Sequence, residues 1–251
     1  MGNIGSPLPM VVVVGPYRSG TSLTVGILEA LGGWFGENDV REGNYSNPMG
    51  FFEDKELDRI CKSFVELPSH RVSDELAGLS SELVAWRREM ESKVSEGNRF
   101  LVAKNPLFCL LGGTISRAWG ENTKVIRVSR EEGASALSIV KRKWKLGGNA
   151  PFGLDESTRL IKLMKEGSIA GFSMFEVLDV RFEDLIEIPE RTVTEISEFL
   201  GFDYDEAMIL AAKQLIRPEL DRSEIGFVRN LLLRMKNAIG RLGRIGNIGW
   251  K

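Results

Sequence analysis

The chain has 251 residues, of which 43% are hydrophobic and 27% charged, and its formal net charge is −2 at pH 7. This length and composition fit one α/β domain with a sizeable core, and we predict a single domain over residues 1–251. The lack of a basic excess argues against a nucleic-acid-binding protein, and no apolar run approaches the roughly eighteen residues of a membrane-spanning helix. Because the N-terminus has no signal-sequence pattern, and Cys61 and Cys109 sit among apolar neighbours, we expect a reducing, cytoplasmic location.

The predicted elements alternate along the chain. Strands rich in β-branched residues are predicted at 10–15, 99–104, 124–129 and 176–182. Helical periodicity fills the intervals, at 21–32, 55–66, 81–96, 107–119, 132–145, 155–166, 190–200 and 205–216. Gly97 and Gly201 stand where helix C-caps are expected. This alternation predicts a three-layer α/β/α fold with a central parallel sheet, whose ligand binds beyond the carboxyl ends of the strands.

The first strand leads into a loop suited to an anion. Four consecutive valines, residues 11–14, predict a strand that is buried on both faces. The segment Arg18-Ser19-Gly20-Thr21-Ser22 then precedes a helix, whose N-terminal N–H groups and positive dipole end favour a phosphate or sulfate. Gly15 and Gly20 have the spacing of a Walker A motif, but Thr21 replaces its lysine and the positive charge lies at Arg18.

At this point the sequence resembles a known family. Residues 16–23, Pro-Tyr-Arg-Ser-Gly-Thr-Ser-Leu, look like the 5′-phosphosulfate loop of sulfotransferases that use 3′-phosphoadenosine 5′-phosphosulfate (PAPS), in their bacterial-type form with arginine. Residues 124–130, Lys-Val-Ile-Arg-Val-Ser-Arg, followed by Ser138, are similar to the family's 3′-phosphate site. Further similar segments are 47–54, 104–106, 180–185 and 199–201, so the resemblance runs in order from about residue 10 to about residue 202.

The resemblance implies a P-loop nucleotide-binding-like fold and a set of site residues. It implies that the loop residues Arg18, Ser19, Gly20, Thr21 and Ser22 hold the 5′-phosphosulfate, that Arg130 and Ser138 hold the 3′-phosphate, and that Phe182 lies near the adenine. Lys104 would contact the bridging oxygen or the sulfonate. Two alternatives stay open, because Lys104 also fits a solvated strand end and Phe182 also fits a core position.

Sulfuryl transfer then implies PAPS as co-substrate and 3′-phosphoadenosine 5′-phosphate (PAP) as product. By analogy with phosphoryl transfer, positioning and cations carry the catalysis, and we expect no metal. The acceptor would be a hydroxyl or amine on a small molecule, a carbohydrate or a lipid. A nucleotide-dependent kinase and a catalytically inactive nucleotide-binding protein remain the alternative functions.

The general base is the most ambiguous assignment. The histidine that cytosolic members carry after the lysine is absent, since Asn105 and Pro106 follow Lys104. Other sulfotransferases use a glutamate near a Phe-Phe pair, and Glu53 follows such a pair. We therefore predict Glu53 as the base, with Asp54 second and His70, in what reads as an exposed turn, third.

Three further segments are surface candidates. The loops at 32–50 and 145–153 are candidate acceptor-binding elements. The tail, about residues 225–251, is basic, and its apolar residues recur at helical spacing. We expect a terminal helix that packs on the domain, with contact to a membrane surface as the alternative.

Overall fold

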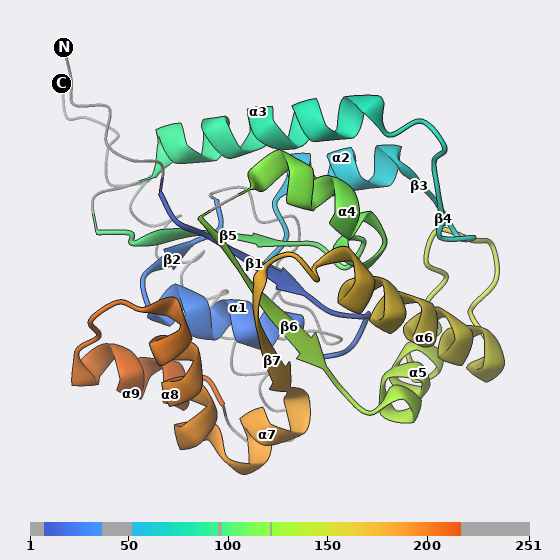
Figure 1. Cartoon of the computed structure of the whole chain (residues 1–251). Coiled ribbons are helices and arrows are strands. Elements are labelled where there is room, and N and C mark those ends of the chain that lie inside the picture. Colours follow the sequence, from blue (N-terminus) through green and yellow to red (C-terminus); the bar gives the residue numbers. More distant parts are fainter. Residues whose placement is uncertain (1–7, 37–51, 95–96, 121, 217–251) are drawn as a thin grey trace, which may run out of the picture.

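The computed structural model describes residues 8–36, 52–94, 97–120 and 122–216, and within these ranges its centre is a parallel sheet (Figure 1). The five strands have the spatial order β2-β5-β1-β6-β7. Their bounds are β1 Met10–Val14, β2 Gly33–Trp34, β5 Phe100–Lys104, β6 Thr123–Ser129 and β7 Glu176–Arg181. All four pairings in this sheet are parallel. The predicted parallel sheet is confirmed.

Helices cover both faces of the sheet and complete three layers (Figure 1). One face packs against α2 Lys55–Ser63, α3 Ala77–Lys93, α4 Phe108–Trp119, α5 Glu132–Lys141 and α6 Leu154–Gly171. The other packs against α1 Thr21–Ala30, α7 Phe182–Glu187, α8 Pro189–Leu200 and α9 Glu206–Gln214. Alternate valines of β1 separate the two cores, with Val12 on the first side and Val13 on the second. The central strand is therefore apolar along its whole length because both of its faces are buried.

Two helices on the first face approach through glycines. A Cβ added at Gly112 of α4 would lie 2.7 Å from the Cα of Gly171 in α6. Only glycine permits this backbone contact, which fixes how α6 crosses α4. The loop that precedes α6 lies beside the loop of residues 15–20 between β1 and α1, which we call the phosphate loop after its predicted role. The crossing of α4 and α6 therefore also fixes one wall of the site described below.

Most predicted elements are present, with differences at their ends. Helix α3 begins at Ala77 and ends at Lys93, so Gly97 lies outside it and is not its C-cap, whereas Gly201 does cap α8 with φ of 76°. Helix α5 ends at Lys141 rather than at 145. The sequence did not predict the short strand β2, the helix α7, or the hairpin of β3 Val65–Glu66 with β4 Arg71–Val72.

The structure also bears on the predictions for the cysteines, for membrane-spanning helices and for the surface segments. Cys61 and Cys109 are buried free thiols, as expected of core residues. Across the described ranges, no helix is both long and apolar enough to cross a membrane. The basic tail at 225–251 and most of the loop at 32–50 lie outside the described residues.

Candidate active site

The carboxyl ends of three adjacent strands bring the predicted cations to one edge of the sheet. In the register of β1 with β5, Val13 pairs with Lys104, the last residue of its strand. The phosphate loop follows β1, and Arg130 follows β6 on the other side of β1. An Nη of Arg130 donates a hydrogen bond of 3.4 Å to the carbonyl oxygen of Arg18. Arg18, Lys104 and Arg130 therefore follow or end three adjacent strands at the same edge of the sheet.

The phosphate loop has a constrained backbone. Arg18 adopts a left-handed conformation with φ of 65°, which is uncommon for a residue with a side chain. Its carbonyl oxygen accepts hydrogen bonds from Arg130 and from the hydroxyl of Ser135, the latter at 3.5 Å. Helix α5 and the end of β6 therefore hold the loop in a conformation that its own sequence does not favour.

Helix α1 begins directly at this loop. Its N-cap is Gly20, with φ of 102° and no side-chain capping bond, and its first turn contains no acidic residue. A Cβ at Gly20 would overlap the ring of Phe182. The first-turn N–H groups of a helix point out along its axis and carry the positive end of the dipole, so this terminus has the form of an anion site.

Ser138 lies buried beside the loop and joins two guanidinium groups. The Nε of Arg18 donates to the hydroxyl oxygen of Ser138 at 3.1 Å, and an Nη of Arg142 donates to the same oxygen at 2.8 Å. Arg142 is the C-cap of α5, four residues after Ser138. The sequence singled out Arg18 and Ser138 but missed Arg142, although the i, i+4 spacing placed it on the same helix face.

The chain reverses sharply after α5. The N–H of Lys143 donates to the carbonyl of Val140, and that of Trp144 donates to the carbonyl of Ile139, with Lys143 at φ of 50°. This is a Schellman ending with lysine in the position that usually holds glycine. It turns Trp144 back onto the loop, where the guanidinium of Arg18 lies 5.3 Å from the centre of the indole ring.

Phe182 also contacts the phosphate loop and its surroundings. The guanidinium of Arg130 lies 4.6 Å from the centre of its ring, and the half-buried ring also packs against Gly20. Strand β7 ends at Arg181, so Phe182 is the first residue of α7 rather than the last of the predicted strand. The ring is thus a wall of the site, stacked on a cation, and both of its contacts are residues assigned to the anion site.

Glu53 and Lys104 form a buried ion pair. The Nζ of Lys104 lies 2.6 Å from an Oε of Glu53, and the two side chains are only 3% and 7% exposed. Lys104 is therefore not the solvated strand end that its sequence position also allowed. Two opposite charges at the carboxyl end of the sheet are removed from water together. Removing either side chain would therefore leave the other charge buried without its counter-ion.

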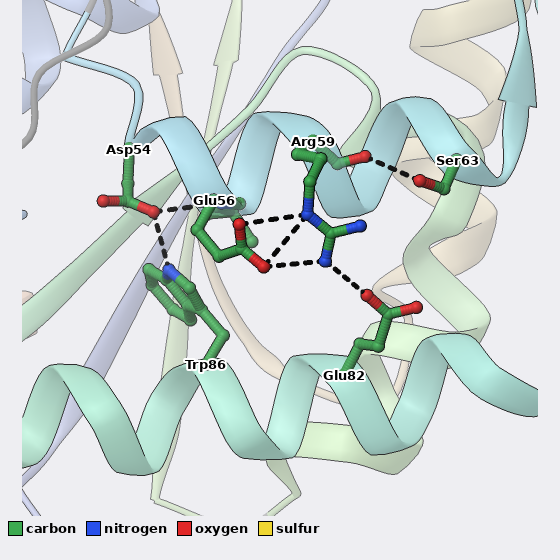
Figure 2. A network of polar contacts seen from close by, with 7 residues as sticks. Asp54, Glu56, Arg59, Ser63, Glu82 and Trp86 are labelled. Atoms are coloured by element: carbon green, nitrogen blue, oxygen red, sulfur yellow. Dashed lines mark hydrogen bonds and ion pairs between the residues drawn. The ribbon is translucent and has the colours of Figure 1, made fainter.

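Asp54, the second candidate base, has two hydrogen bonds that serve the fold. Its Oδ1 accepts from the N–H of Leu57 at 3.0 Å, which caps α2, and from the indole Nε1 of Trp86 at 2.9 Å (Figure 2). The Nη of Arg59 on the same helix reaches Glu82 of α3 at 2.7 Å. Asp54 thus sits at one end of a network that ties α2 to α3.

His70 is buried, so the expectation of an exposed side chain is wrong. It does lie in a turn, at φ of 57° between β3 and β4, but the side chain packs inward against Tyr17 and Phe152. Its Nδ1 donates to the carbonyl of Pro68 at 2.6 Å, and its Nε2 accepts from the hydroxyl of Tyr17 at 3.4 Å. Burial lowers the pKa of the imidazole from 6.5, an effect that the Pro68 hydrogen bond opposes.

The loop at 145–153 packs onto the turn that carries His70. A Cβ at Gly147 would lie 2.6 Å from the Cβ of Leu67. Trp144 and His70 each meet the ring of Tyr17 edge-on, with centroid distances of 6.1 Å and 5.7 Å. The turn, the loop and Tyr17 therefore form one aromatic wall beside Arg18.

The donor set fits an anion with several oxygens. Arginines, a lysine, hydroxyls and a helix N-terminus are donors, as a phosphosulfate or phosphate requires. The Ser19 hydroxyl is buried and has no hydrogen-bond partner within the described residues. Among those residues, no group of three or more His, Cys, Asp or Glu side chains has metal-site geometry.

Comparison with known proteins agrees with this geometry. The model of a family described as the sulfotransferase family matches residues 9–206. The chain belongs to the sulfotransferase family. The family resemblance stated from the sequence is thereby confirmed, and the match covers every site residue discussed above.

Two curated relatives are similar to this chain over most of its length. Protein-tyrosine sulfotransferase 2 of Gallus gallus is 25% identical over 210 residues, which cover 80% of this chain and 53% of the relative. A putative protein-tyrosine sulfotransferase of Caenorhabditis briggsae is 26% identical over 238 residues, which cover 92% and 77%. The chain therefore spans about half the length of the first relative.

Solved structures show the same fold at low identity. Sulfotransferase STF9 from Mycobacterium avium superimposes with a TM-score of 0.54 at 10% identity, covering 84% of this chain and 68% of that one. The sulfotransferase domain of the curacin biosynthetic pathway gives a TM-score of 0.52 at 18% identity, with coverages of 86% and 80%. That of the Synechococcus PCC 7002 olefin synthase gives 0.51 at 18%, with 88% and 81%. The predicted three-layer α/β fold is confirmed.

Proposed function

We propose that this member of the sulfotransferase family transfers a sulfuryl group from PAPS to a hydroxyl or amine acceptor and releases PAP. One observation carries the proposal. Arg18, Arg130 and the N-terminus of α1 gather at the carboxyl ends of the strands, and the buried Glu53–Lys104 pair lies at the end of the neighbouring strand. This arrangement supports the proposal of an anion site and an acid–base pair at one edge of the sheet.

The site residues fit the donor in two parts. The loop from Arg18 to Ser22, with the first-turn N–H groups of α1, would hold the 5′-phosphosulfate. Arg130 and Ser138 would hold the 3′-phosphate, and the Phe182 ring beside Arg130 would lie against the adenine. PAPS itself supplies the activated sulfuryl group.

The cations of the chain would stabilise the charge that develops during transfer. Arg18 presents a planar fork that matches two anionic oxygens, and Lys104 presents a compact charge at a strand end. Because these groups supply positive charge at the place where a kinase uses magnesium, we expect transfer without a divalent ion.

Glu53 is the group best placed to accept the acceptor's proton. Of the three candidates, Asp54 caps α2 by accepting from the N–H of Leu57 and also accepts from Trp86. Both ring nitrogens of His70 are engaged by Pro68 and Tyr17. Glu53 alone is paired with a residue assigned to the transfer itself, Lys104. The proton would pass from the acceptor to a carboxylate oxygen of Glu53, while Lys104 keeps the site charge-balanced.

The acceptor class follows the sequence prediction: a hydroxyl or amine on a small molecule, a carbohydrate or a lipid. The names of the two curated relatives add the tyrosyl hydroxyl to the acceptors to be tested. We also propose that the chain forms one domain over residues 1–251 and acts in the cytoplasm.

Titration calorimetry with PAP, AMP and ATP tests the donor site. PAP should bind at least about tenfold more tightly than AMP, because a 3′-phosphate adds charge-assisted hydrogen bonds to Arg130 and Ser138. Arg130→Ala should lose most of this preference and keep the melting temperature of the free protein. Equal affinity for PAP and AMP in the wild type would overturn the PAPS assignment, and magnesium-dependent ATP turnover would replace it with a kinase.

A transfer assay with labelled PAPS, a chelator and an acceptor panel tests the enzymatic step. Glu53→Gln should keep PAP affinity and lose about a hundredfold or more in rate, the usual scale of general base catalysis. Near-normal turnover by Glu53→Gln would remove Glu53 from the mechanism. PAP binding with no transfer to any acceptor would favour an inactive nucleotide-binding protein.

A further inference from the structure

Three exposed lysines mark the turn between α5 and α6. Lys141 is the last residue of α5, and Lys143 and Lys145 follow at every second position. None of the three makes an ion pair with a residue in the described ranges. Several other surface cations are each matched by a nearby acid, namely Arg59, Lys62, Arg71, Lys165 and Arg191. The turn is therefore a concentration of unbalanced positive charge on a chain whose formal net charge is −2.

Lys143 occupies a backbone position that favours glycine. Its φ is 50°, in the left-handed region, at the Schellman ending of α5. Glycine adopts this conformation without strain, whereas a lysine holds it at a cost in conformational energy. The side chain is exposed, and its ammonium group forms no hydrogen bond or ion pair with the described part of the chain. A strained residue whose charge has no partner inside the fold indicates a contact outside it.

Exposed leucines adjoin these lysines. Leu137 precedes Lys141 by four residues and so lies on the same face of α5, and it is 45% exposed. Leu154, the first residue of α6, is 47% exposed. Both leucines line one surface hollow of about 530 Å³ between the two helices, which lie side by side (Figure 1). The charged residues of this hollow are one acid and one base, Asp155 and Arg159, so the lysines determine the sign of the surrounding surface.

We propose that this face docks the protein on the surface of an anionic lipid bilayer, through a lysine–leucine patch of Leu137, Lys141, Lys143, Lys145 and Leu154. A bilayer that contains phosphatidylserine offers both parts of the complement, negative headgroups for the lysines and an apolar boundary for the leucines. A soluble polyanion would engage the lysines alone and leave the two leucines in water. The patch adjoins the anion site, since Trp144 in the same turn lies over Arg18. The docking goes beyond the proposed function, and it requires no sulfuryl transfer.

Sedimentation of the full chain with vesicles tests the docking. The probes are vesicles of phosphatidylcholine alone and of phosphatidylcholine mixed with phosphatidylserine. The wild type should bind the mixed vesicles more tightly than the neutral ones. Raising the salt from about 0.1 M to about 1 M should weaken this binding, because the Debye length falls from about 10 Å to about 3 Å. Binding should persist in excess PAP or inorganic phosphate, either of which would displace a lipid headgroup from the anion site.

Two multiple variants separate the charged and apolar parts of the patch. A triple lysine-to-glutamine variant should weaken binding to the mixed vesicles about a hundredfold, from about fivefold for each lysine near an anionic surface; it combines Lys141→Gln, Lys143→Gln and Lys145→Gln. Leu137→Ser with Leu154→Ser should weaken the binding at least about fivefold. The matched control removes three cations of α2, α3 and α9 that make no ion pair with described residues, and it should change the affinity less than about threefold; it combines Lys55→Gln, Arg88→Gln and Lys213→Gln.

Lys143→Gly separates docking from folding. Glycine relieves the strain at a φ of 50°, so the melting temperature of the free protein should not fall. The affinity for the mixed vesicles should nevertheless drop about fivefold, because one lysine is lost from the patch. A lysine with a structural role only would lower the melting temperature when it is replaced and leave vesicle binding unchanged.

Several results would overturn the proposal. Equal binding by the wild type and the triple lysine variant would assign the membrane contact to another part of the chain, such as the basic segment at 225–251, which every variant retains. Unchanged binding by the leucine variant, with equally tight binding of the wild type to polyglutamate, would assign the lysines to a soluble polyanion. Loss of binding in PAP or phosphate would assign the headgroup to the anion site. A wild type that does not prefer the mixed vesicles refutes the docking and leaves the proposed function standing.

Discussion

Removing Lys104 should destabilise the fold far more than removing both members of its ion pair. Lys104→Met leaves the Glu53 carboxylate buried without its cation, whereas Lys104→Met with Glu53→Leu leaves two apolar side chains of similar volume. The pair is 2.6 Å long and almost wholly buried. Its charges were removed from water on folding, and that cost remains when only one partner is deleted.

The expected magnitudes follow from the geometry. At 2.6 Å and an effective dielectric constant of about 20, the attraction within the pair is about 6 kcal/mol, similar in size to the penalty for desolvating two ions. The intact pair therefore contributes little net stability. Deleting one partner should cost about 3–5 kcal/mol of unfolding free energy, and replacing both should cost less than about 2 kcal/mol.

Urea denaturation of the single and double variants measures these differences. The Arg71–Glu66 pair provides the control, because its side chains are 76% and 59% exposed, so Arg71→Met should cost less than about 1 kcal/mol. If the double variant loses as much stability as Lys104→Met, the apolar replacement has failed to relieve a buried charge, and the desolvation argument is wrong. If Lys104→Met costs no more than Arg71→Met, the pair is not buried in solution.

Two further predictions concern the loop and its aromatic wall. Gly20→Ala should destabilise the protein by about 1–3 kcal/mol and weaken PAP binding, because φ is 102° and the new Cβ would meet Phe182. Gly113→Ala, in open space on α4, is the control and should be neutral or stabilising. Equal effects of the two substitutions in urea denaturation would contradict this prediction. Burial lowers the pKa of His70, the single histidine, so below about pH 6.5 the unfolded chain binds a proton that the folded chain resists, and stability should fall as the pH drops from 7.5 to 5.5. His70→Gln should flatten this part of the profile, and an identical profile in the two proteins would refute the argument.

The elements around the loop could be predicted because their signals are local. The signals for β1, the loop and α1 are adjacent in sequence: four valines predict the strand, Gly15 and Gly20 mark the loop, and apolar residues at helical spacing predict the helix. Both faces of β1 are buried, so its composition alone reports its place at the centre of the sheet. The ends of elements were less predictable, as at Lys143, where a lysine adopts the left-handed conformation expected of glycine.

The parts of the site that escaped prediction depend on contacts distant in sequence. His70 lies among polar residues and reads as exposed, yet it is buried because Tyr17 and Phe152, more than fifty residues away on either side, pack against it. Trp144 carries no motif, and its position over Arg18 follows from the Schellman ending of α5. No pattern within one segment records such contacts, since they exist only after the segments have been assembled.

Glu53 and Asp54 are adjacent in sequence, but their carboxylates have different partners. They follow each other in sequence and are both buried, so composition and burial do not distinguish them. Asp54 adopts the extended conformation of an N-cap, and its carboxylate turns to the N–H of Leu57 and to Trp86. Because successive side chains of an extended segment point in opposite directions, Glu53 is directed to the other side, where it meets Lys104 at the carboxyl end of β5. The cap that begins α2 thus fixes the orientation of the proposed base, and any substitution of Asp54 should act on catalysis through the position of Glu53.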